Sequence, residues 1–341
     1  MRNGANARFA LVFAGLLAVI AASVYLSLTN GTFDLSVADV MKTLLRLDRV
    51  HEHELVVFEF RLPRIVLGGL VGFALGVAGS VIQGVTRNAL ADPGILGINA
   101  GAGMAVVLFM LLLQGEMNTT GWLAVFTMPL FGVAGGLAAT AMIYVFARSR
   151  GGGLDPQRLI LAGIAISSGF GAVTLYASLR MNARDFEMAA VWLTGSIYGA
   201  DWKFVAMMLP WLLVLVPFLW LRANVLDLFQ LQESSVKGLG VSMERERNRL
   251  LLGSIGLVSV SVAVSGSIGF VGLLGPHIAR RLVGLRHRLS LPISGLVGAA
   301  MVIAGDLIGR SVFAPAELAV GIVISIIGVP YFVYLLIRAR K

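Results

Sequence analysis

A few polar side chains interrupt the apolar stretches of this chain, and their types suit ion pairing or proton transfer. Gln83 lies near the end of one apolar stretch, and Glu317 begins another. Asp306 and Arg310 lie four positions apart in a third stretch, so they share one helix face and can pair. A charge at membrane depth is unfavourable by roughly 3 kcal/mol unless it is paired or hydrated. These residues therefore suggest either an internal ion pair or a proton relay through Asp306 and Glu317.

The motifs of several common enzyme classes are missing. A phosphate-binding loop needs a glycine-rich turn that ends in Lys-Ser or Lys-Thr. Only Lys42 among the four lysines is followed by threonine, and no glycine-rich turn precedes it. The chain also has no His-Glu-x-x-His zinc helix and no Gly-x-Ser-x-Gly turn. We therefore expect no catalytic residues, and no ATP hydrolysis by this chain through a phosphate-binding loop.

The run His51-Glu52-His53-Glu54 is a cluster of possible metal ligands. In an extended segment, alternation would place both histidines on one side. No clear third ligand accompanies them. We interpret the run as a solvated loop and expect neither a metal nor a cofactor in this chain.

The composition predicts a membrane protein. The chain has 341 residues, of which 57% are hydrophobic and 13% are charged, and its mean hydropathy is +0.87. Soluble domains carry about 25% charged residues. This contrast excludes an ordinary soluble domain and a disordered chain. Cysteine is absent, so disulfides and thiolate chemistry are excluded as well.

About ten stretches are long and apolar enough to be predicted as membrane spans, since a bilayer core needs about 20 apolar helical residues per span. They are residues 8–28, 61–85, 92–113, 121–147, 157–180, 201–222, 248–266, 268–285, 292–310 and 317–338. The first is too long for the apolar region of a signal peptide, so we expect a retained helix. The sequence thus predicts one all-α transmembrane domain over 1–341, with an external loop at about 29–60 and an inner loop at about 223–248.

The distribution of basic residues predicts the orientation. With the N-terminus inside and ten spans, about two thirds of the 27 Lys and Arg residues fall on the cytoplasmic side. Both termini are therefore expected in the cytoplasm of a multi-pass plasma-membrane protein. The same bias accounts for the net charge of +9 without a nucleic-acid partner.

Small residues recur every four positions in three of the predicted spans. The stripes are Gly68, Gly72, Gly76, Ser80 and Gly84; Gly132, Gly136 and Thr140; and Gly163, Ser167 and Gly171. Such stripes let helices approach closely within a membrane. They predict a tightly packed bundle.

The inner loop mixes charged and apolar residues on the cytoplasmic side. Its apolar positions include Leu226, Leu228, Leu239 and Val241, and two glycines interrupt it at Gly238 and Gly240. This pattern favours one or two short amphipathic helices. We interpret them as a docking surface for a cytoplasmic partner, with a plain membrane-surface helix as the alternative.

Several motifs, in this order, resemble the permease subunits of type II ABC importers that take up iron siderophores, haem and vitamin B12. They are Arg61-Leu-Pro-Arg64; Thr86-Arg-Asn-Ala-Leu-Ala-Asp-Pro-Gly94; Trp192-Leu-Thr-Gly-Ser196; the run from Gly266 to Arg280; and Asp306 to Arg310, Glu317 to Gly321 and Gly328-Val-Pro330. The resemblance covers the second to the tenth predicted span. Among these importers the chain looks most similar to the ferric siderophore permeases.

The resemblance implies particular partners and roles. The chain would pair with a second copy or a paralogous permease, above two cytoplasmic ATPase subunits that bind ATP and Mg, and would receive substrate from an extracytoplasmic binding protein. Arg61 and Arg310 match the arginines that dock the binding protein, while Asn88 and Leu90 match a cytoplasmic gate. The inner loop matches the element that couples to the ATPase; its implied coupling residues are Leu226, Leu228, Gln232, Glu233, Gly238, Leu239, Gly240 and Val241.

The sequence leaves alternatives open. A haem or cobalamin importer permease of the same family fits the same motifs. A proton-coupled secondary transporter that uses Asp306 is the alternative from another class. The chain also departs from the family at Ala89, where proline is usual, and this position lies within the implied gate.

Overall fold

The computed structural model describes residues 2–30, 35–47, 50–113, 122–148, 156–231, 236, 238, 241–314 and 316–339. The secondary-structure elements in these ranges are all helices. The inner-loop residues Gln232, Glu233, Leu239 and Gly240 lie outside the described residues.

Each of the ten predicted spans contains a helix. These helices are α1 (Arg2–Thr29), α4 (Leu62–Thr86), α5 (Ile98–Leu112), α6 (Trp122–Ala147), α7 (Pro156–Leu179), α9 (Trp202–Leu221), α12 (Met243–Ser265), α13 (Val271–Val283), α14 (His287–Ser311) and α15 (Val320–Ala339). Seven helical segments of the described chain are long and apolar enough to cross a membrane. The all-α multi-pass fold predicted from the sequence is therefore confirmed.

The remaining three helices are shorter than predicted. Helix α15 has 20 residues and α5 has 15, whereas each was predicted as a span of 22 residues. Helix α13 has 13 residues, which rise about 20 Å and fall short of a core about 30 Å thick. A tight turn precedes α13, with positive φ angles at Gly266 and Phe270. The predicted span 268–285 is thus a helix about two thirds as long as the core is thick, and it starts inside the bundle.

Short helices occupy the segments between the spans. They are α2 (Val37–Leu44), α3 (His51–Glu54), the π-helical segment η1 (Leu55–Arg61), the 3₁₀ turn η2 (Pro93–Leu96), α8 (Ala183–Leu193) and α10 (Ala223–Leu228). The predicted external loop is therefore largely helical. Helix α3 runs through η1 into α4, and this continuous helix begins at His51.

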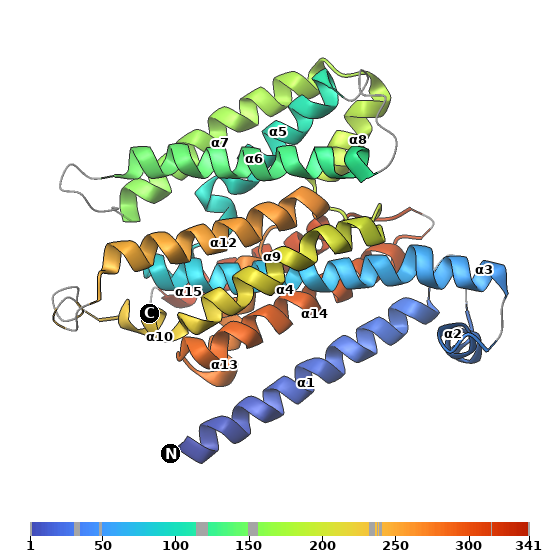
Figure 1. Ribbon diagram of the computed structural model, residues 1–341, viewed down its shortest axis with the longest axis horizontal. Helices are drawn as coiled ribbons and strands as arrows, with labels where there is room; N and C mark the ends of the chain where they lie inside the picture. Colours follow the sequence, from blue (N-terminus) through green and yellow to red (C-terminus); the bar gives the residue numbers. More distant parts are fainter. Residues whose placement is uncertain are drawn as a thin grey trace.

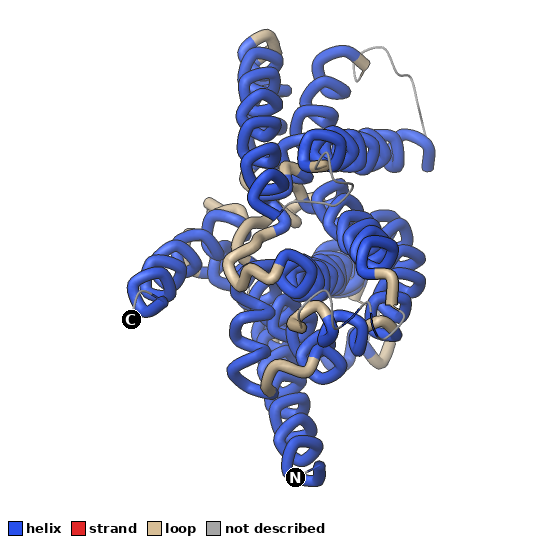
Figure 2. The backbone as a smooth tube through the Cα atoms, turned by 90° about the vertical axis from the view of Figure 1, so that its left-hand side faces the viewer, coloured by secondary structure: helices blue, strands red, loops and turns tan. Residues whose placement is uncertain are grey.

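The helices form two groups and two outlying elements. In Figure 1, α5 to α8 lie together at the top, and α12, α9, α4, α14 and α13 form the body below them. Helix α1 runs obliquely along the bottom of that view. Figure 2 shows the C-terminal helix standing out from the side of the bundle. The two termini both lie toward the end that holds α10 (Figure 1).

We call the end of the bundle that holds Arg61, Arg64 and Arg310 the outer end. The opposite end, which holds Arg87, Asp227 and His287, is the inner end. The positive-inside bias predicts that the inner end faces the cytoplasm.

Glycines bring α4 and α14 into backbone contact. A Cβ on Gly72 would lie 2.2 Å from the carbonyl oxygen of Gly298, and a Cβ on Gly298 would lie 2.1 Å from that of Gly72. Gly76 approaches the carbonyl oxygen of Ser294 equally closely. Real side chains do not approach backbone this closely, so these positions require glycine. The predicted stripe on the second span thus packs α4 on α14.

The predicted small-residue stripes on α6 and α7 differ in whether another helix packs against them. On α6, a Cβ at Gly132 would contact Ala263 and one at Gly136 would contact Ser259, so this stripe faces α12. On α7, a Cβ on Gly171 would meet nothing within 4 Å. Part of the small-residue face of α7 therefore stays open in this chain.

Candidate functional site

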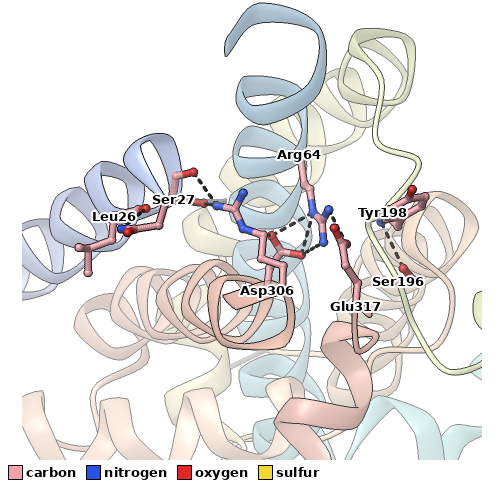
Figure 3. Close-up of polar contacts among 9 residues, drawn as sticks. Leu26, Ser27, Arg64, Ser196, Tyr198, Asp306 and Glu317 are labelled. Atoms are coloured by element: carbon pink, nitrogen blue, oxygen red, sulfur yellow. Dashed lines mark hydrogen bonds and ion pairs between the residues drawn. The ribbon is translucent and has the colours of Figure 1, made fainter. Parts of the chain in front are cut away.

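An arginine and two carboxylates form the central polar cluster of the outer end. Nε of Arg64 lies 2.9 and 3.0 Å from the two carboxylate oxygens of Asp306, and Nη2 lies 2.8 Å from Oδ1. Nη1 of Arg64 lies 2.9 Å from Oε2 of Glu317. The Arg64 guanidinium also lies 5.6 Å from the ring centre of Tyr198 (Figure 3). The cluster therefore joins α4 to α14 and to the segment that leads into α15.

The expected pairing of Asp306 with Arg310 is only a minor contact. Nε of Arg310 lies 3.9 Å from Oδ2 of Asp306, beyond hydrogen-bonding distance. Asp306 is 4% exposed, and Arg64 contacts both of its oxygens. Because Arg64 forms a bidentate pair, it is the main counter-charge of Asp306. The prediction that Asp306 and Arg310 share a helix face is correct, but no pattern in the sequence indicated a partner from α4.

The other two outer arginines bind the end of α1. Nη2 of Arg310 donates a hydrogen bond of 2.6 Å to the carbonyl oxygen of Ser27 and a second to its hydroxyl. Nη1 of Arg61 donates to the carbonyl oxygen of Leu28. The last four carbonyls of a helix have no partner within it, and its C-terminus favours positive charge. Arg61 and Arg310 thus cap the C-terminus of α1.

Both capping arginines are turned inward. Arg61 is 5% exposed, and the Arg310 side chain is 9% exposed. They also line a cavity of about 680 Å³ at the outer end, together with Arg64, Glu59 and Glu317. The implied docking arginines therefore lie in the wall of an outer cavity rather than on a protruding surface. A carboxylate that entered this cavity would meet three guanidinium groups, alongside the carboxylates of Glu59, Asp201 and Glu317.

The local helix geometry positions these arginines. Arg61 ends the π-helical segment η1, and Arg64 lies in the first turn of α4. The two residues are three apart, so they lie close to one face of the continuous helix. Trp202 donates a hydrogen bond from Nε1 to the carbonyl oxygen of Phe58, 2.8 Å away. This bond helps to satisfy the irregular backbone of η1.

Gln83 joins two helices inside the bundle. Nε2 lies 3.3 Å from the carbonyl oxygens of both Gly272 and Leu273, and Oε1 accepts a hydrogen bond from Arg280. Gln83 is buried, and these partners satisfy both ends of its amide. The predicted intramembrane polar residue therefore fastens α4 to the start of α13.

The implied gate residues lie in the turn that follows α4. Arg87 ends the helix with a left-handed φ of 53°, and the Asn88 side chain then accepts a hydrogen bond of 2.9 Å from the backbone of Leu90. Asp92 closes the turn by accepting a bond from Gly94. Asn88 thus orders a tight turn at the inner end even though alanine occupies position 89.

The described part of the inner loop contains the expected short helix. Helix α10 buries Leu226, while Leu228 is half-buried and Gly238 is exposed. Val241 is half-buried just before α12. Because Leu226 is fully buried, its side chain holds α10 in place and does not face a partner. Leu231, directly after α10, is 47% exposed and offers an apolar contact at the inner end.

The histidine and glutamate run at 51–54 is helical rather than extended. Helix α3 places His51 and His53 on different faces, because successive helical residues turn by about 100°. The described residues contain no group of three or more His, Cys, Asp or Glu side chains that could hold a metal ion.

Sequence reasoning assigned no role to Arg64, although it closes the Arg61-Leu-Pro-Arg64 motif. Two lone carboxylates at membrane depth, Asp306 and Glu317, required a cation, and Arg64 was an available one.

Helix α8 was also not predicted from the sequence. Asn182 accepts a hydrogen bond from the backbone of Asp185, so an N-cap followed by an acidic first turn was the available signal.

Known proteins match nearly the whole chain. The model of the FecCD transport family matches residues 17–338. The iron-uptake system permease protein FeuC of Bacillus subtilis is 47% identical over 96% of this chain and 98% of its own length. The iron(3+)-hydroxamate import system permease protein FhuG of B. subtilis is 45% identical, over 84% of this chain and 85% of its own length.

More distant relatives agree with these. The Fe(3+) dicitrate transport system permease protein FecD of Escherichia coli is 40% identical over 85% of this chain and 87% of its own length. A solved structure, described as an inward-facing conformation of a metal-chelate type ABC transporter, superposes with a TM-score of 0.81. It is 30% identical and covers 96% of this chain and 99% of its own. The chain therefore belongs to the FecCD transport family.

Proposed function

We propose that this chain is the permease subunit of an ATP-binding-cassette importer that moves a ferric siderophore into the cytoplasm. The observation that carries the proposal is the match along nearly the whole chain to permeases named for iron uptake, iron–hydroxamate and iron–dicitrate import. These names share a ferric chelate as cargo. The permease performs no covalent chemistry in this scheme and changes its conformation when partner subunits bind and hydrolyse ATP.

The polar chemistry of the bundle supports a chelate rather than a bare ion. A bare cation would call for several free carboxylates at depth. Asp306, the deeply buried one, is already neutralised by Arg64. A large chelate brings its own ligands for the metal and needs only a weakly charged path.

Three parts of the bundle suit the three proposed partners. The arginine-lined outer cavity suits carboxylates of an extracytoplasmic binding protein, with Arg61 and Arg310 as docking residues. Helix α10 and the exposed Leu231 suit a cytoplasmic ATPase subunit, which would bind ATP and Mg. The open glycine face of α7 suits a second copy of the chain or a paralogous permease.

Two alternative functions predict different experimental results. In the first, the importer carries haem or cobalamin in place of a ferric siderophore. In the second, the chain is a secondary transporter driven by a proton gradient, with Asp306 as the proton carrier. The bidentate contact with Arg64 disfavours the second alternative, because Arg64 already engages both carboxylate oxygens of Asp306.

Uptake of radioactive iron tests the cargo. Cells that lack their own ferric chelate permeases would express this chain together with its partner binding protein and its partner ATPase subunit. We expect uptake of at least one ferric hydroxamate, catecholate or citrate complex, and competition by an excess of the same chelate loaded with gallium. Uptake of haem or cobalamin with no uptake of any ferric chelate would contradict the proposed cargo.

A further inference from the structure

A carboxylate on α10 caps the beginning of α14. Oδ1 of Asp227 accepts a hydrogen bond of 3.0 Å from the backbone N–H of His287 and lies 2.7 Å from Nδ1 of the same residue. A carboxylate at a helix N-terminus satisfies a free N–H group and complements the helix dipole. Arg286, which precedes the helix, makes no side-chain capping bond. The cap of α14 therefore comes from the inner loop.

The other edge of the His287 ring lies against the last turn of α4. His287 is 2% exposed, and a Cβ built on Gly84 would lie 3.0 Å from its Nε2 atom. The same Cβ would lie 3.2 Å from a methyl carbon of Leu226 on α10. The imidazole and α10 thus occupy the space that a side chain at position 84 would fill. Glycine at this position lets α10, α14 and α4 meet.

A second contact joins the end of α4 to the segment that follows α10. Nη2 of Arg87, the residue that ends α4, donates a hydrogen bond of 2.8 Å to the carbonyl oxygen of Leu231. Leu231 follows α10, so the end of α4 contacts both Leu226 of this short helix and the segment directly after it. The turn that carries Asn88 and Leu90 begins directly after Arg87.

Helix α10 is also held by apolar contacts within the bundle. Leu226 and Phe229 are fully buried, so α10 cannot slide over the end of α4 without breaking packing. A displacement of α10 must therefore move its neighbours with it or break the Asp227–His287 pair.

We propose that the Asp227–His287 pair is a positioning link through which movement of α10 reaches the Asn88–Leu90 turn. This inference rests on the proposed function, in which an ATPase moves the inner loop. Asp227 pulls on the first residue of α14, and the His287 ring transfers the displacement to Gly84 and the turn that follows it. Arg87 supplies a parallel contact through Leu231, so the turn responds both to α10 and to the segment that follows it.

Labelling of a single cysteine tests the link directly. The chain contains no cysteine, so Leu90→Cys introduces the only thiol. The full complex, with its ATPase and binding protein, would be reconstituted and treated with a membrane-impermeant maleimide from the ATPase side. In the otherwise unmodified complex, we expect the labelling rate to differ between the nucleotide-free state and the state with a non-hydrolysable ATP analogue.

Breaking the link should remove this response. A buried hydrogen bond to a charged group contributes enough that its loss changes an equilibrium by about tenfold or more. Asp227→Ala and His287→Ala should therefore each reduce the nucleotide-dependent change in rate by about tenfold. The double variant should lose no more than either single one, because the two residues act as a unit. Asp227→Asn keeps an acceptor oxygen and should restore most of the response.

A matched control separates the link from general damage. Asp39→Ala also removes an aspartate near a helix N-terminus, where Asp39 accepts a hydrogen bond from Ser36, but it lies on α2 at the outer end. We expect the labelling response of this variant to match that of the unmodified complex. Co-purification with the ATPase and the thermal midpoint would show whether each variant is folded and assembled.

The outcomes separate the link from the proposed function. An unmodified complex that responds to nucleotide, with Asp227→Ala and His287→Ala complexes that assemble and do not respond, supports the link. The same response in assembled variants would overturn the link and leave the importer function intact. Should the alanine variants fail to assemble, the assembled Asp227→Asn complex decides: a partial loss of the response, smaller than tenfold, would support the link, and a full response would overturn it. An unmodified complex that neither responds to nucleotide nor hydrolyses ATP would overturn both proposals.

Discussion

Arg64 contacts both carboxylate oxygens of Asp306, although the two residues lie 242 positions apart in the chain. This bidentate pair crosses the interface where the glycines of α4 and α14 bring the two backbones together. The pair is nearly buried, with side-chain exposures of 13% for Arg64 and 5% for Asp306. Breaking such a pair by removing one member leaves an uncompensated buried charge.

Arg64→Ala should lower the free energy of unfolding by about 3–5 kcal/mol, because it leaves Asp306 buried without its main partner. Thermal unfolding of the purified protein in detergent measures this loss. Arg180→Ala, which removes an exposed arginine, is the control. The double variant Arg64→Ala with Asp306→Ala should recover much of the stability. Strictly additive losses would contradict a direct pair.

Removing the arginines that cap α1 should release its C-terminus. A hydrogen bond to a charged group contributes about 1.5–3 kcal/mol, so Arg61→Ala and Arg310→Ala should each increase hydrogen exchange in the last turn of α1. Mass spectrometry of peptides that cover residues 22–30 would detect the change. Unchanged exchange in both variants would show that the caps do not hold this turn.

Charge reversal separates capping from docking. Arg61→Glu should weaken the affinity for the binding protein by about tenfold or more, because it places a like charge opposite the expected carboxylates. Arg61→Gln keeps a donor for the helix cap and should weaken docking less than reversal does. Surface plasmon resonance with reconstituted permease measures both. Equal affinity in all three proteins would remove Arg61 from the docking site.

Gly72→Ala should destabilise the bundle, since its Cβ would lie 2.2 Å from the Gly298 carbonyl oxygen and force α4 away from α14. Overpacking of this kind costs about 1–3 kcal/mol. Gly15→Ala on α1 is the matched control, because its Cβ would meet nothing within 4 Å. The thermal midpoint should fall only in the first variant. Equal midpoints would show that α4 and α14 separate without cost.

Leu231→Asp should weaken the contact with the ATPase and reduce transport, because this exposed leucine lies beside α10. Co-purification with the ATPase and the ratio of ATP hydrolysed to iron transported are the measurements. Leu47→Asp replaces a leucine at the outer end that is more exposed than Leu231, at 74%, and should leave both unchanged. Leu226→Asp, at a fully buried position, should instead lower the folded yield. Unaltered coupling in Leu231→Asp would place the ATPase contact elsewhere.

The sequence predicted the helices better than their lengths or partners. Apolar stretches mark spans because each must match the bilayer, so all ten contained helices. The same hydropathy cannot show that α13 begins at a turn inside the bundle, since a buried turn is as apolar as a span. The segment 29–60 is predicted as a loop because its helices are too short to be recognised as spans: α2 has 8 residues and α3 has 4.

The sites were predicted by position and not by contact. Arg61, Arg310 and Asp306 do lie together at the outer end, as motif and orientation suggested. Their actual partners, Arg64 and the carbonyls of α1, are set by tertiary packing between segments far apart in sequence. The Asp227–His287 pair was missed for the same reason, because neither residue stands out within its own segment.

The energy source of transport is the most direct test of the central claim. Proteoliposomes would contain this permease, its ATPase and its binding protein loaded with a radioactive ferric chelate, and accumulation would be measured with internal ATP or with an imposed proton gradient. We predict accumulation with ATP only, abolished when the ATPase subunit is omitted and retained in Asp306→Asn protein to the extent that this variant folds. Accumulation driven by the proton gradient without any ATPase subunit would contradict the account.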